Sequence, residues 1–396
     1  MSFVKAKYCL KGISLPQVIK NTAQIEPADG LYPAFSASGQ DVWLDNFVYD
    51  GDAIILSAVG ARCGKCFLAS GKWGLCANTH VLLPNAEIAD KNYLFYIVNN
   101  EDWWIKGGTA QPFVKVSESL GQVIYLPSFL EQKAIANYLD DRCSKIDEII
   151  AEAAASIEEY KELRKVVITE AVTRGIGVQG TLKNSGYDWM GYIPSDWNIA
   201  PLKHISTKSI SYGVIKLFDP DENGVFVLRC SDVKAGFLDT TNIRTITKEL
   251  SDEYKRTLLS ENDVVINVRG TLGGCAVIPK SMEGYNIARE VALISPDRTK
   301  YDSKYIMYYL LSDIFERFRD SSLSGAIYVG INMETLSHFR IAYPSIAEQR
   351  EITKYLDGKV SVIDALISEK QALIDDLQTY KKSLIYEMVT GKRRVS

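Results

Sequence analysis

The sequence has few of the features that mark a membrane, secreted or metal-dependent protein. No apolar run approaches the roughly 18 residues that a membrane span requires, and residues 1–7 lack the apolar core of a signal peptide. We therefore expect a cytoplasmic protein. Seven cysteines, an odd number scattered over 396 residues, do not predict a disulfide framework. Only three histidines are present, which leaves few candidates for acid–base catalysis.

The chain also lacks a strong charge of either sign. Its formal net charge is −4, with 45 basic and 49 acidic residues, which argues weakly against a strongly basic nucleic-acid binder. Net charge does not show how charges are distributed, so DNA binding would require basic side chains to gather on one face. Hydrophobic residues make up 46% and charged residues 24% of the sequence, as in ordinary globular domains. The length predicts two or three domains.

Short motifs that carry catalysis or metal binding are incomplete or missing. Cys63 and Cys66 have the spacing of half a zinc site, but no second pair follows at a suitable distance. The stretch Gly60–Lys65 is one residue shorter than a Walker phosphate loop. Residues 219–230 begin like a calcium loop but end in Cys230 instead of a glutamate. The sequence contains no nucleophile elbow, no His-Glu-x-x-His motif and no dinucleotide fingerprint, and it lacks the aromatic Pro-Pro motif of adenine methyltransferases. We therefore predict no catalytic residue, no metal site and no cofactor.

What the sequence does contain is an internal repeat. The segment that begins Pro-Ser-Phe-Leu-Glu-Gln-Lys at Pro127 returns as Pro-Ser-Ile-Ala-Glu-Gln-Arg at Pro344, an offset of 217 residues. The match continues without a gap to residues 171–173, which align with residues 388–390. Internal repeats outrank local signals in reading a fold. The chain is therefore predicted to be pseudo-two-fold, with blocks in the order A-B-A′-B′ and the repeat in the B blocks.

Each B block is predicted to be a long helix. Apolar residues recur at alternating spacings of four and three, which is the seam of a coiled coil. The seam positions are Leu139, Cys143, Ile146, Ile150, Ala153, Ile157, Tyr160, Arg164, Val167 and Ala171 in the first copy, and Leu356, Val360, Ile363, Ile367, Lys370, Ile374, Leu377, Lys381, Leu384 and Met388 in the second. Gly175 and Gly391 lie near the two ends, as stop signals do. An amphipathic helix of about 40 residues, roughly 60 Å long, needs a partner, and the matched registers favour pairing of the two copies over two unrelated surface helices.

The A blocks are predicted to be mixed α/β. In each, a buried strand leads into a glycine-rich turn that carries an arginine and then into a return strand, at residues 52–66 and 263–276. A polar cluster, another apolar strand, a helix-like segment and a second turn follow in the same order. The helix-like segments are 92–99 and 303–320, and the second turns are 107–111 and 324–328. Outside these landmarks the blocks differ widely, and only A′ has the aromatic lead-in Trp189–Trp197.

This order of blocks resembles the DNA-specificity (S) subunit of type I restriction-modification systems. The resemblance rests on the Gly-Tyr-Ile-Pro…Trp lead-in at 191–197, the two Pro-x-x-x-Glu-Gln helix starts, and the Arg-Gly and Gly-Lys turns of the variable blocks. No single motif is specific to the family, but their order, repeated twice, covers essentially the whole chain. Block A departs from the pattern because it begins without a Trp-rich lead-in, so its first strand is expected to be short or built differently.

The resemblance implies an α/β (α+β) architecture in which two long helices form an antiparallel coiled coil between two target recognition domains. The expected parts are target recognition domain 1 (1–126), a central helical spacer (127–180), target recognition domain 2 (181–343) and a C-terminal helical spacer (344–396). The resemblance also implies a non-catalytic subunit that reads a bipartite, asymmetric site on double-stranded DNA. It would dock two methyltransferase (M) subunits and, through them, restriction (R) subunits, with no membrane partner. The coiled-coil length would fix the gap between the two half-sites.

Candidate DNA-binding residues lie on or beside the predicted turns, where binding residues concentrate on rigid scaffolds. Arginine can read guanine, and asparagine or glutamine can read adenine, each with two hydrogen bonds, whereas lysine more often holds phosphates. The candidates are Arg62, Lys65, Asn78, His80 and Gln111 in block A, and Arg229, Ser231, Arg269, Thr271, Arg289 and Tyr328 in block A′. For the arginines the alternative is a solvated or ion-paired side chain. For Asn78 and His80 it is a capping or core role.

Candidate partner-binding residues are Glu131, Gln132, Glu348 and Gln349, in the first turn of each repeated helix. A glutamate there favours the positive end of the helix dipole, and a glutamine can satisfy a free backbone donor. The functional interpretation is that the matched pairs contact two copies of one subunit in the same way. Two other classes of protein stay open: a specificity module of another restriction-methylation enzyme type, and a coiled-coil adaptor that binds no DNA.

Overall fold

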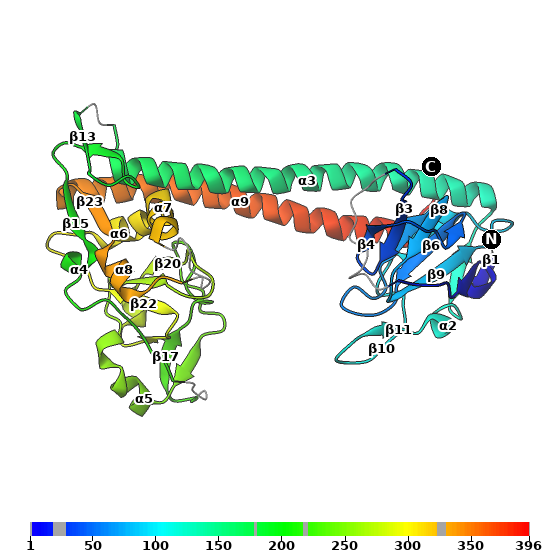
Figure 1. Ribbon diagram of the computed structural model, residues 1–396, viewed down its shortest axis with the longest axis horizontal. Helices are drawn as coiled ribbons and strands as arrows, with labels where there is room; N and C mark the ends of the chain where they lie inside the picture. The colour runs from blue at the N-terminus through cyan, green and yellow to red at the C-terminus, as the bar shows by residue number, and fades with distance from the viewer. Residues whose placement is uncertain (1, 19–28, 178–179, 217–220, 323–329, 396) are drawn as a thin grey trace. The chain divides into compact units, whose positions relative to one another are not determined.

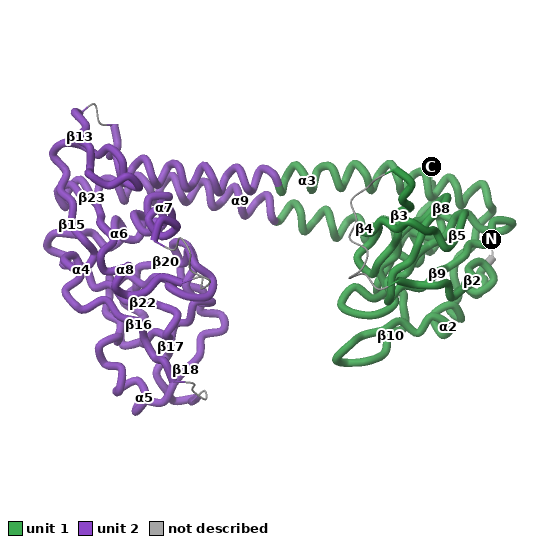
Figure 2. Tube along the Cα trace, in the orientation of Figure 1, with its two compact units in different colours: residues 1–154, 372–396 green, residues 155–371 purple. Residues whose placement is uncertain are grey.

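Figure 1 shows the computed structural model, which describes residues 2–18, 29–177, 180–216, 221–322 and 330–395. The chain divides into two compact units, drawn in different colours in Figure 2. Unit 1 contains Met1–Ala154 and Ala372–Ser396, and unit 2 contains Ala155–Gln371. Each unit holds one mixed α/β block and part of each long helix. None of the helices in the described ranges is both long and apolar enough to cross a membrane.

The central sheet of unit 1 is antiparallel and lies between helices and a second sheet. Its strand order is β2 (Leu10–Ile13), β9 (Thr79–Pro84), β6 (Ala53–Ser57) and β7 (Cys66–Ala69). Side chains alternate across β6: Ile54 and Leu56 join the core under the helices, whereas Ala53 and Ile55 pack on the second sheet. The second sheet has the order β4 (Gly39–Leu44), β3 (Tyr32–Ser36), β8 (Lys72–Leu75) and β5 (Tyr49–Asp50). Because both faces of β6 are covered, the strand is a continuous apolar run in the sequence.

Shorter elements complete unit 1. β1 (Ser2–Lys5) pairs with β12 (Val123–Leu126), and β10 (Lys106–Gly107) pairs with β11 (Phe113–Val114). A 3-10 turn at Ala6–Tyr8 follows β1, and the short helices are α1 (Lys91–Val98) and α2 (Val116–Ser119). Asp90 caps α1, since its carboxylate accepts a hydrogen bond from the N–H of Tyr93 at 2.9 Å.

Unit 2 repeats this plan with different side chains. Its central sheet has the order β16 (Ser211–Tyr212), β22 (Val291–Ile294), β19 (Val264–Asn267) and β20 (Cys275–Val277). A smaller sheet has the order β18 (Arg244–Ile246), β17 (Val225–Leu228) and β21 (Asn286–Ile287). The two-stranded pairs are β15 (Asn198–Pro201) with β23 (Arg340–Tyr343), and β13 (Leu182–Asn184) with β14 (Tyr192–Pro194). β1 and β15 are both four residues long and take equivalent antiparallel partners, so block A begins with the counterpart of β15.

Unit 2 has short helices both within the predicted helix-like segment 303–320 and outside it. They are α4 (Leu202–Ile205), α5 (Lys248–Glu253), α6 (Ser303–Leu310), α7 (Asp313–Ser322) and α8 (Met333–His338), with 3-10 turns at Lys255–Thr257 and Lys280–Met282. The segment predicted at 303–320 is therefore two helices, α6 and α7. The turn predicted at 324–328 lies outside the described residues.

The two repeated segments form the long helices α3 (Phe129–Arg174) and α9 (Ile346–Val389). None of the predicted seam residues is exposed. Gly175 and Gly391 follow the helices with φ of +76° and +74°, the left-handed conformation that ends a helix and suits glycine. The prediction of two long amphipathic helices with glycine stops is confirmed.

Ion pairs between α3 and α9 show that the helices run antiparallel. In unit 1, Lys381 Nζ lies 2.6 Å from the carboxylate of Asp147, and in unit 2, Arg164 Nε lies 3.0 Å from Asp364 Oδ1. The 217-residue repeat relates the two acids to each other and the two bases to each other, so both pairs are the same contact made once in each unit. The long basic stems lie on the seam, as predicted for these positions.

Buried tyrosines provide a second contact that occurs once in each unit. In both, a hydroxyl from the helix that follows the central sheet lies against one carbonyl of a strand and one carbonyl of a long helix. In unit 1 the Tyr93 hydroxyl donates to the carbonyl oxygens of Tyr125 (2.8 Å) and Val389 (3.4 Å). In unit 2 the Tyr305 hydroxyl donates to those of Ala342 (2.8 Å) and Val172 (3.1 Å). The equivalence of the units therefore extends from the helices into the α/β blocks.

Candidate nucleic-acid interface

In unit 1, the turn between β6 and β7 presents two of the predicted cations, Arg62 and Lys65, which are both exposed. Backbone hydrogen bonds close this turn. The N–H of Gly64 donates to the Ser57 carbonyl at 2.9 Å, and the N–H of Ser57 donates to the Lys65 carbonyl at 2.8 Å. Gly64 has a φ of +101°, and a Cβ there would lie 3.2 Å from the Cα of Glu101. The backbone therefore fixes the turn while its cationic side chains reach solvent.

Ala58, the residue after β6, joins this turn to two other loops. Its N–H donates to the carbonyl of Asn78 at 2.9 Å, and its carbonyl accepts from the N–H of Val114 at 2.9 Å. Asn78 is exposed and has a φ of +70°. Gln111 is exposed in the β10–β11 loop that leads to Val114. The structure thus brings four predicted DNA-binding residues to one end of the central sheet: Arg62, Lys65, Asn78 and Gln111.

His80 lies at the same end of the sheet, but its ring is packed inside the unit. It is half-buried on β9, and a Cβ at Gly12 of the neighbouring strand β2 would lie 2.8 Å from its Nε2. Burial lowers the pKa of His80, which favours the neutral imidazole. The geometry argues against the prediction that His80 contacts DNA and matches the core role that was its alternative.

The corresponding end of the sheet in unit 2 has the same backbone hydrogen bonds. Val268, the residue after β19, donates to the carbonyl of Glu290 at 2.9 Å and accepts from the N–H of Ile331 at 2.9 Å. Arg269 and Arg289, the neighbours of Val268 and Glu290, are both exposed. These hydrogen bonds therefore bring two predicted arginines, from different turns, to the same end of the central sheet.

The two arginines differ in their surroundings. The guanidinium of Arg269 lies 5.7 Å from the ring centre of Tyr212, within cation–π range, and makes no ion pair in the part of the chain described. Nε of Arg289 donates to the carboxylate of Glu290 at 3.0 Å, but the side chain stays 53% exposed. Such exposed pairs contribute little energy, so either arginine can turn to an anionic ligand. Thr271 is exposed on the same turn as Arg269.

Arg229 and Ser231 both donate hydrogen bonds to one carboxylate, that of Asp232, although Ser231 is exposed. Nε and Nη2 of Arg229 donate to the two oxygens of Asp232 at 3.0 and 2.8 Å, and the Ser231 hydroxyl donates to the same carboxylate at 2.8 Å. Asp232 is only 3% exposed, so removal of its cation would leave a buried charge unpaired. The hydrogen bond with Asp232 also raises the pKa of Arg229. The ion pair argues against a DNA contact by Arg229, whereas the exposed Ser231 stays a predicted DNA-binding residue.

Asn267 is a buried polar residue beside the candidate interface that the sequence did not single out. It ends β19, is 2% exposed, and its Nδ2 lies 3.0, 3.1 and 3.0 Å from the carbonyl oxygens of Cys230, Val233 and Thr271. One buried amide therefore ties the 230–233 loop to the turn that follows β19. Ser57 ends β6 at the corresponding place and makes no such bridge. The available signal was a polar residue at the end of an otherwise apolar strand.

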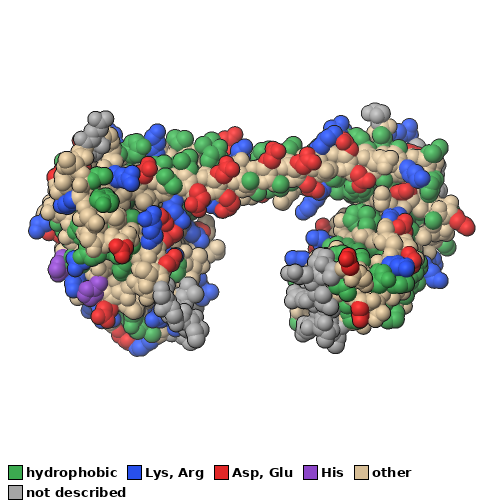
Figure 3. Space-filling view, turned by 45° about the horizontal axis from the view of Figure 1, so that its top comes forward, with side chains coloured by type: hydrophobic (Ala, Val, Ile, Leu, Met, Phe, Trp, Pro, Cys, Tyr) green, Lys and Arg blue, Asp and Glu red, His purple; other side chains and the backbone are tan. Residues whose placement is uncertain are grey.

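Tyr328, the last of the predicted DNA-binding residues, lies outside the described residues. On the face drawn in Figure 3, Lys and Arg side chains alternate with Asp and Glu instead of forming one basic field. Within the described ranges, no group of three or more His, Cys, Asp or Glu side chains could hold a metal ion. The candidate interface therefore consists of a few cationic and amide side chains on turns that backbone hydrogen bonds hold in place.

The glutamines predicted to bind a partner are buried. Gln132 is 1% and Gln349 0% exposed. Each Oε1 accepts one backbone N–H and each Nε2 donates to two carbonyls. The partners are Asp90, Ile88 and Pro127 for Gln132, and Asp302, Lys300 and Pro344 for Gln349. Their burial argues against the prediction that these amides contact another subunit, because they join α3 and α9 to the starts of α1 and α6.

Glu131 and Glu348 are half-buried at the same helix starts. Glu348 Oε1 accepts a hydrogen bond from Nε1 of Trp197 at 3.2 Å. Burial raises the pKa of Glu348, and this hydrogen bond acts in the opposite direction. In unit 2 the glutamate thus anchors the aromatic lead-in Trp189–Trp197 to α9.

Comparisons with known proteins agree with this architecture. An E. coli protein, the type I restriction enzyme EcoBI specificity subunit, is 28% identical over 252 residues, which cover 62% of this chain and 52% of that subunit. The MjaVIII specificity subunit of Methanocaldococcus jannaschii is 27% identical over 390 residues, which cover 93% of this chain and 88% of that subunit. A chain from a solved structure of a type I R-M system matches the fold with a TM-score of 0.70 at 16% identity, over 99% of this chain and 98% of that chain.

The model of one protein family matches both α/β blocks and parts of both long helices. That family is described as the type I restriction modification DNA specificity domain, and the matches span residues 36–159 and 194–375. Together they cover more than half of the chain. The chain belongs to the family of type I restriction-modification DNA specificity domains.

Proposed function

We propose that this chain is the non-catalytic, DNA-reading subunit of a type I restriction-modification complex, and that each unit reads one half of a bipartite, asymmetric site. One observation carries the proposal. Ala58 and Val268 make the same two backbone hydrogen bonds at the end of the central sheet, yet the side chains around them differ. Unit 1 offers Arg62, Lys65, Asn78 and Gln111, whereas unit 2 offers Arg269, Thr271 and Arg289. Two units with the same backbone geometry and different side chains suit a DNA site whose two halves differ in sequence.

The chemistry of these side chains suits major-groove reading. The guanidinium of Arg269 can donate two hydrogen bonds to guanine O6 and N7, and the amides of Asn78 and Gln111 can pair with adenine. Lys65 suits a phosphate, which sets register without reading sequence. On this proposal, specificity depends on these few groups.

We propose that two methyltransferase subunits dock on the repeated helical segments, and that restriction subunits join through them. Exposed apolar side chains support this at positions related by the repeat. They are Ile149 (44%) with Leu366 (36%), and Leu163 (46%) with Tyr380 (50%). Large exposed apolar side chains that recur in register suit a partner that binds twice in the same way. The helical segments would also set the spacing between half-sites, since half-site spacing is geometric when two readers are joined.

Selection of DNA from a random library by the chain, purified with its methyltransferase subunits, tests the proposal. We expect the enriched sequences to share two short, unrelated motifs separated by a fixed number of unspecified base pairs. Arg269→Ala should relax one motif only. Enrichment of a single contiguous motif, or of none, would refute bipartite reading.

A further inference from the structure

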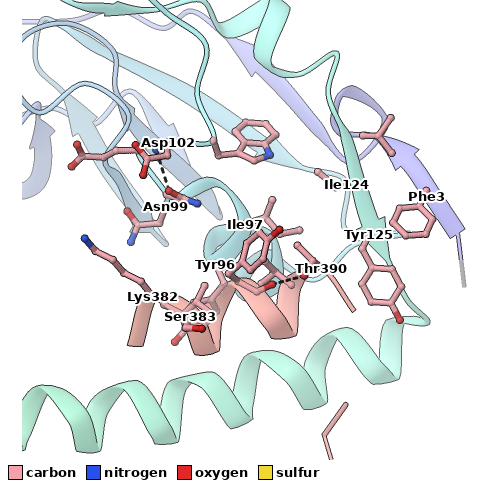
Figure 4. Close-up of a pocket in the computed structure, with 17 residues that line it drawn as sticks. Phe3, Tyr96, Ile97, Asn99, Asp102, Ile124, Tyr125, Lys382, Ser383 and Thr390 are labelled. Atoms are coloured by element: carbon pink, nitrogen blue, oxygen red, sulfur yellow. Dashed lines mark hydrogen bonds between the residues drawn. The ribbon is translucent and has the colours of Figure 1, made fainter. Parts of the chain in front are cut away.

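Unit 1 contains a cavity of about 800 Å³ that the proposed function does not use (Figure 4). β1, β12, the turn after α1 and the last turns of α9 form its walls. In Figure 4, Asn99 and Asp102 lie across the cavity from Lys382 of α9. Apolar side chains at the rim are open to solvent, since Phe3 is 69% and Tyr386 49% exposed. Exposed aromatic groups around a cavity of this size indicate a site that a ligand covers.

The repeat relates each wall of this cavity to a segment of unit 2. β1 corresponds to β15, β12 to β23, α1 to α6, and the end of α9 to the end of α3. The paired strands and the tyrosine contacts establish this equivalence. Lys382 and Ile124 of the cavity thus correspond to Lys165 and Ile341 of unit 2.

In unit 2 the corresponding space is filled by the aromatic lead-in and by α7. The ring centre of Trp189 lies 5.3 Å from those of both Phe318 and Phe339. Met190 and Ile193 belong to the same buried cluster as Ile168, Val172 and Ile341. The positive charge of Lys165 is neutralised as well, because its Nζ donates to the carboxylate of Glu316 on α7 at 2.7 Å.

Neither filling is present among the described residues of unit 1. The turn after α1 takes the place of α7. Lys382 is exposed and makes no ion pair within the described ranges, unlike its counterpart Lys165. The cavity therefore combines an apolar wall with an unneutralised cation.

We propose that this cavity binds a peptide segment of a partner polypeptide that carries a tryptophan or tyrosine for the apolar wall and a carboxylate for Lys382. The filled counterpart in unit 2 specifies both parts of that chemistry, through Trp189 for the wall and Glu316 for the lysine. A peptide suits the site better than a nucleic acid, because the corresponding place in unit 2 holds protein side chains, Trp189 and Glu316. The rim of the site lies against one of the DNA-reading turns, because a Cβ at Gly64 would lie 3.2 Å from the Cα of Glu101, and the site adds a protein contact beside that turn.

A labelled synthetic peptide with the sequence of residues 181–197, which contains two tryptophans and two aspartates, is the probe. Fluorescence anisotropy with the full chain should show saturable binding. Replacing the first tryptophan of the peptide, which corresponds to Trp189, with alanine should weaken binding at least about tenfold. In the chain, Lys382→Glu and Ser383→Trp should each weaken binding by at least about tenfold. Ser383 is exposed and lines the cavity, so the tryptophan would fill it without disturbing the core.

Lys354→Glu is the matched control, since it makes the same charge change at an exposed position of α9 that does not line the cavity. It should bind the peptide like the parent chain. Absence of saturable binding, or equal affinity of the parent and the Ser383→Trp variant, would overturn the proposal. Self-association of the chain that Ser383→Trp abolishes would also overturn it, by assigning the cavity to a second copy. Circular dichroism and DNA selection with Ser383→Trp, both expected to be unchanged, separate this outcome from a failure of folding or of DNA reading.

Discussion

Replacing Asn267 with alanine should weaken DNA reading by unit 2 and leave unit 1 unaffected. The substitution removes an amide nitrogen that lies within 3.1 Å of three carbonyl oxygens. Leaving a buried acceptor without its donor costs about 1–3 kcal/mol. The Oδ1 of Asn267, itself buried without a hydrogen bond, disappears too and offsets part of this cost. We therefore expect unit 2 to lose about 2 kcal/mol of unfolding free energy, which lowers Tm by about 4–8 °C for a unit of 150 or more residues.

The effect on recognition is measured separately for each half-site. Without the amide, the turn that carries Arg269 and Thr271 is no longer tied to the 230–233 loop, so those side chains lose their fixed position. Binding assays with the complete complex on DNA mutated in one half at a time should show discrimination reduced by about 1–3 kcal/mol at the half read by unit 2. Discrimination at the other half should equal that of the parent protein.

Ser57→Ala is the matched control, at the corresponding position of unit 1. The Ser57 hydroxyl is buried but makes no hydrogen bond, so its loss should change stability by less than about 0.5 kcal/mol. Equal Tm values for Asn267→Ala and the parent, with both half-sites read normally, would refute the idea that this amide positions the reading turn.

Four further predictions test other parts of the account. Arg269→Ala should cost about 1–3 kcal/mol at the half-site read by unit 2 alone, and methylation of single-base variants that is unchanged would count against its role. Gln349→Leu should lower the free energy of unfolding by about 2 kcal/mol, because one backbone N–H and two carbonyls lose their partner. Urea unfolding measures this loss. A change in unfolding free energy no larger than that of the exposed-site variant Lys354→Ala would contradict the prediction. Inserting one heptad into both α3 and α9 adds about 10 Å to each helix and should lengthen the DNA between the two half-sites by about three base pairs. Loss of all recognition would instead mean that the helices only support the fold. With acidic residues interleaved among the basic ones on the face drawn in Figure 3, the slope of log K against log[salt] should be about −3 to −5. A slope steeper than about −8 would contradict the expectation of few phosphate contacts.

The helical part of the fold was predictable because its signals are local and repeated. The spacing of four and three along α3 recurs along α9, and glycine follows both helices. The order of strand, glycine turn and return strand was also readable, since β6 and β19 are apolar runs followed by glycines. These features depend on the residues of one segment and on backbone preferences.

The roles of single polar side chains were less predictable, because they depend on partners chosen by tertiary packing. Arg229 and Asp232 are visible in the sequence, but only the folded loop shows that the carboxylate accepts hydrogen bonds from Nε and Nη2 of the guanidinium. Gln132 was expected at a helix start, yet its burial follows from the loop before α1, which lies about 40 residues earlier in the chain. Asn267 bridges three carbonyls from the 230–233 loop and from the turn after β19, so no local pattern marks it.

Genome-wide methylation mapping tests the central claim most directly. A host that carries this chain with its methyltransferase subunit is compared with the same host carrying the methyltransferase subunit alone. The account predicts a new methylated motif made of two different half-sites separated by a fixed gap, present only when the chain is present. A contiguous or palindromic motif, or the same methylation with and without the chain, would contradict it.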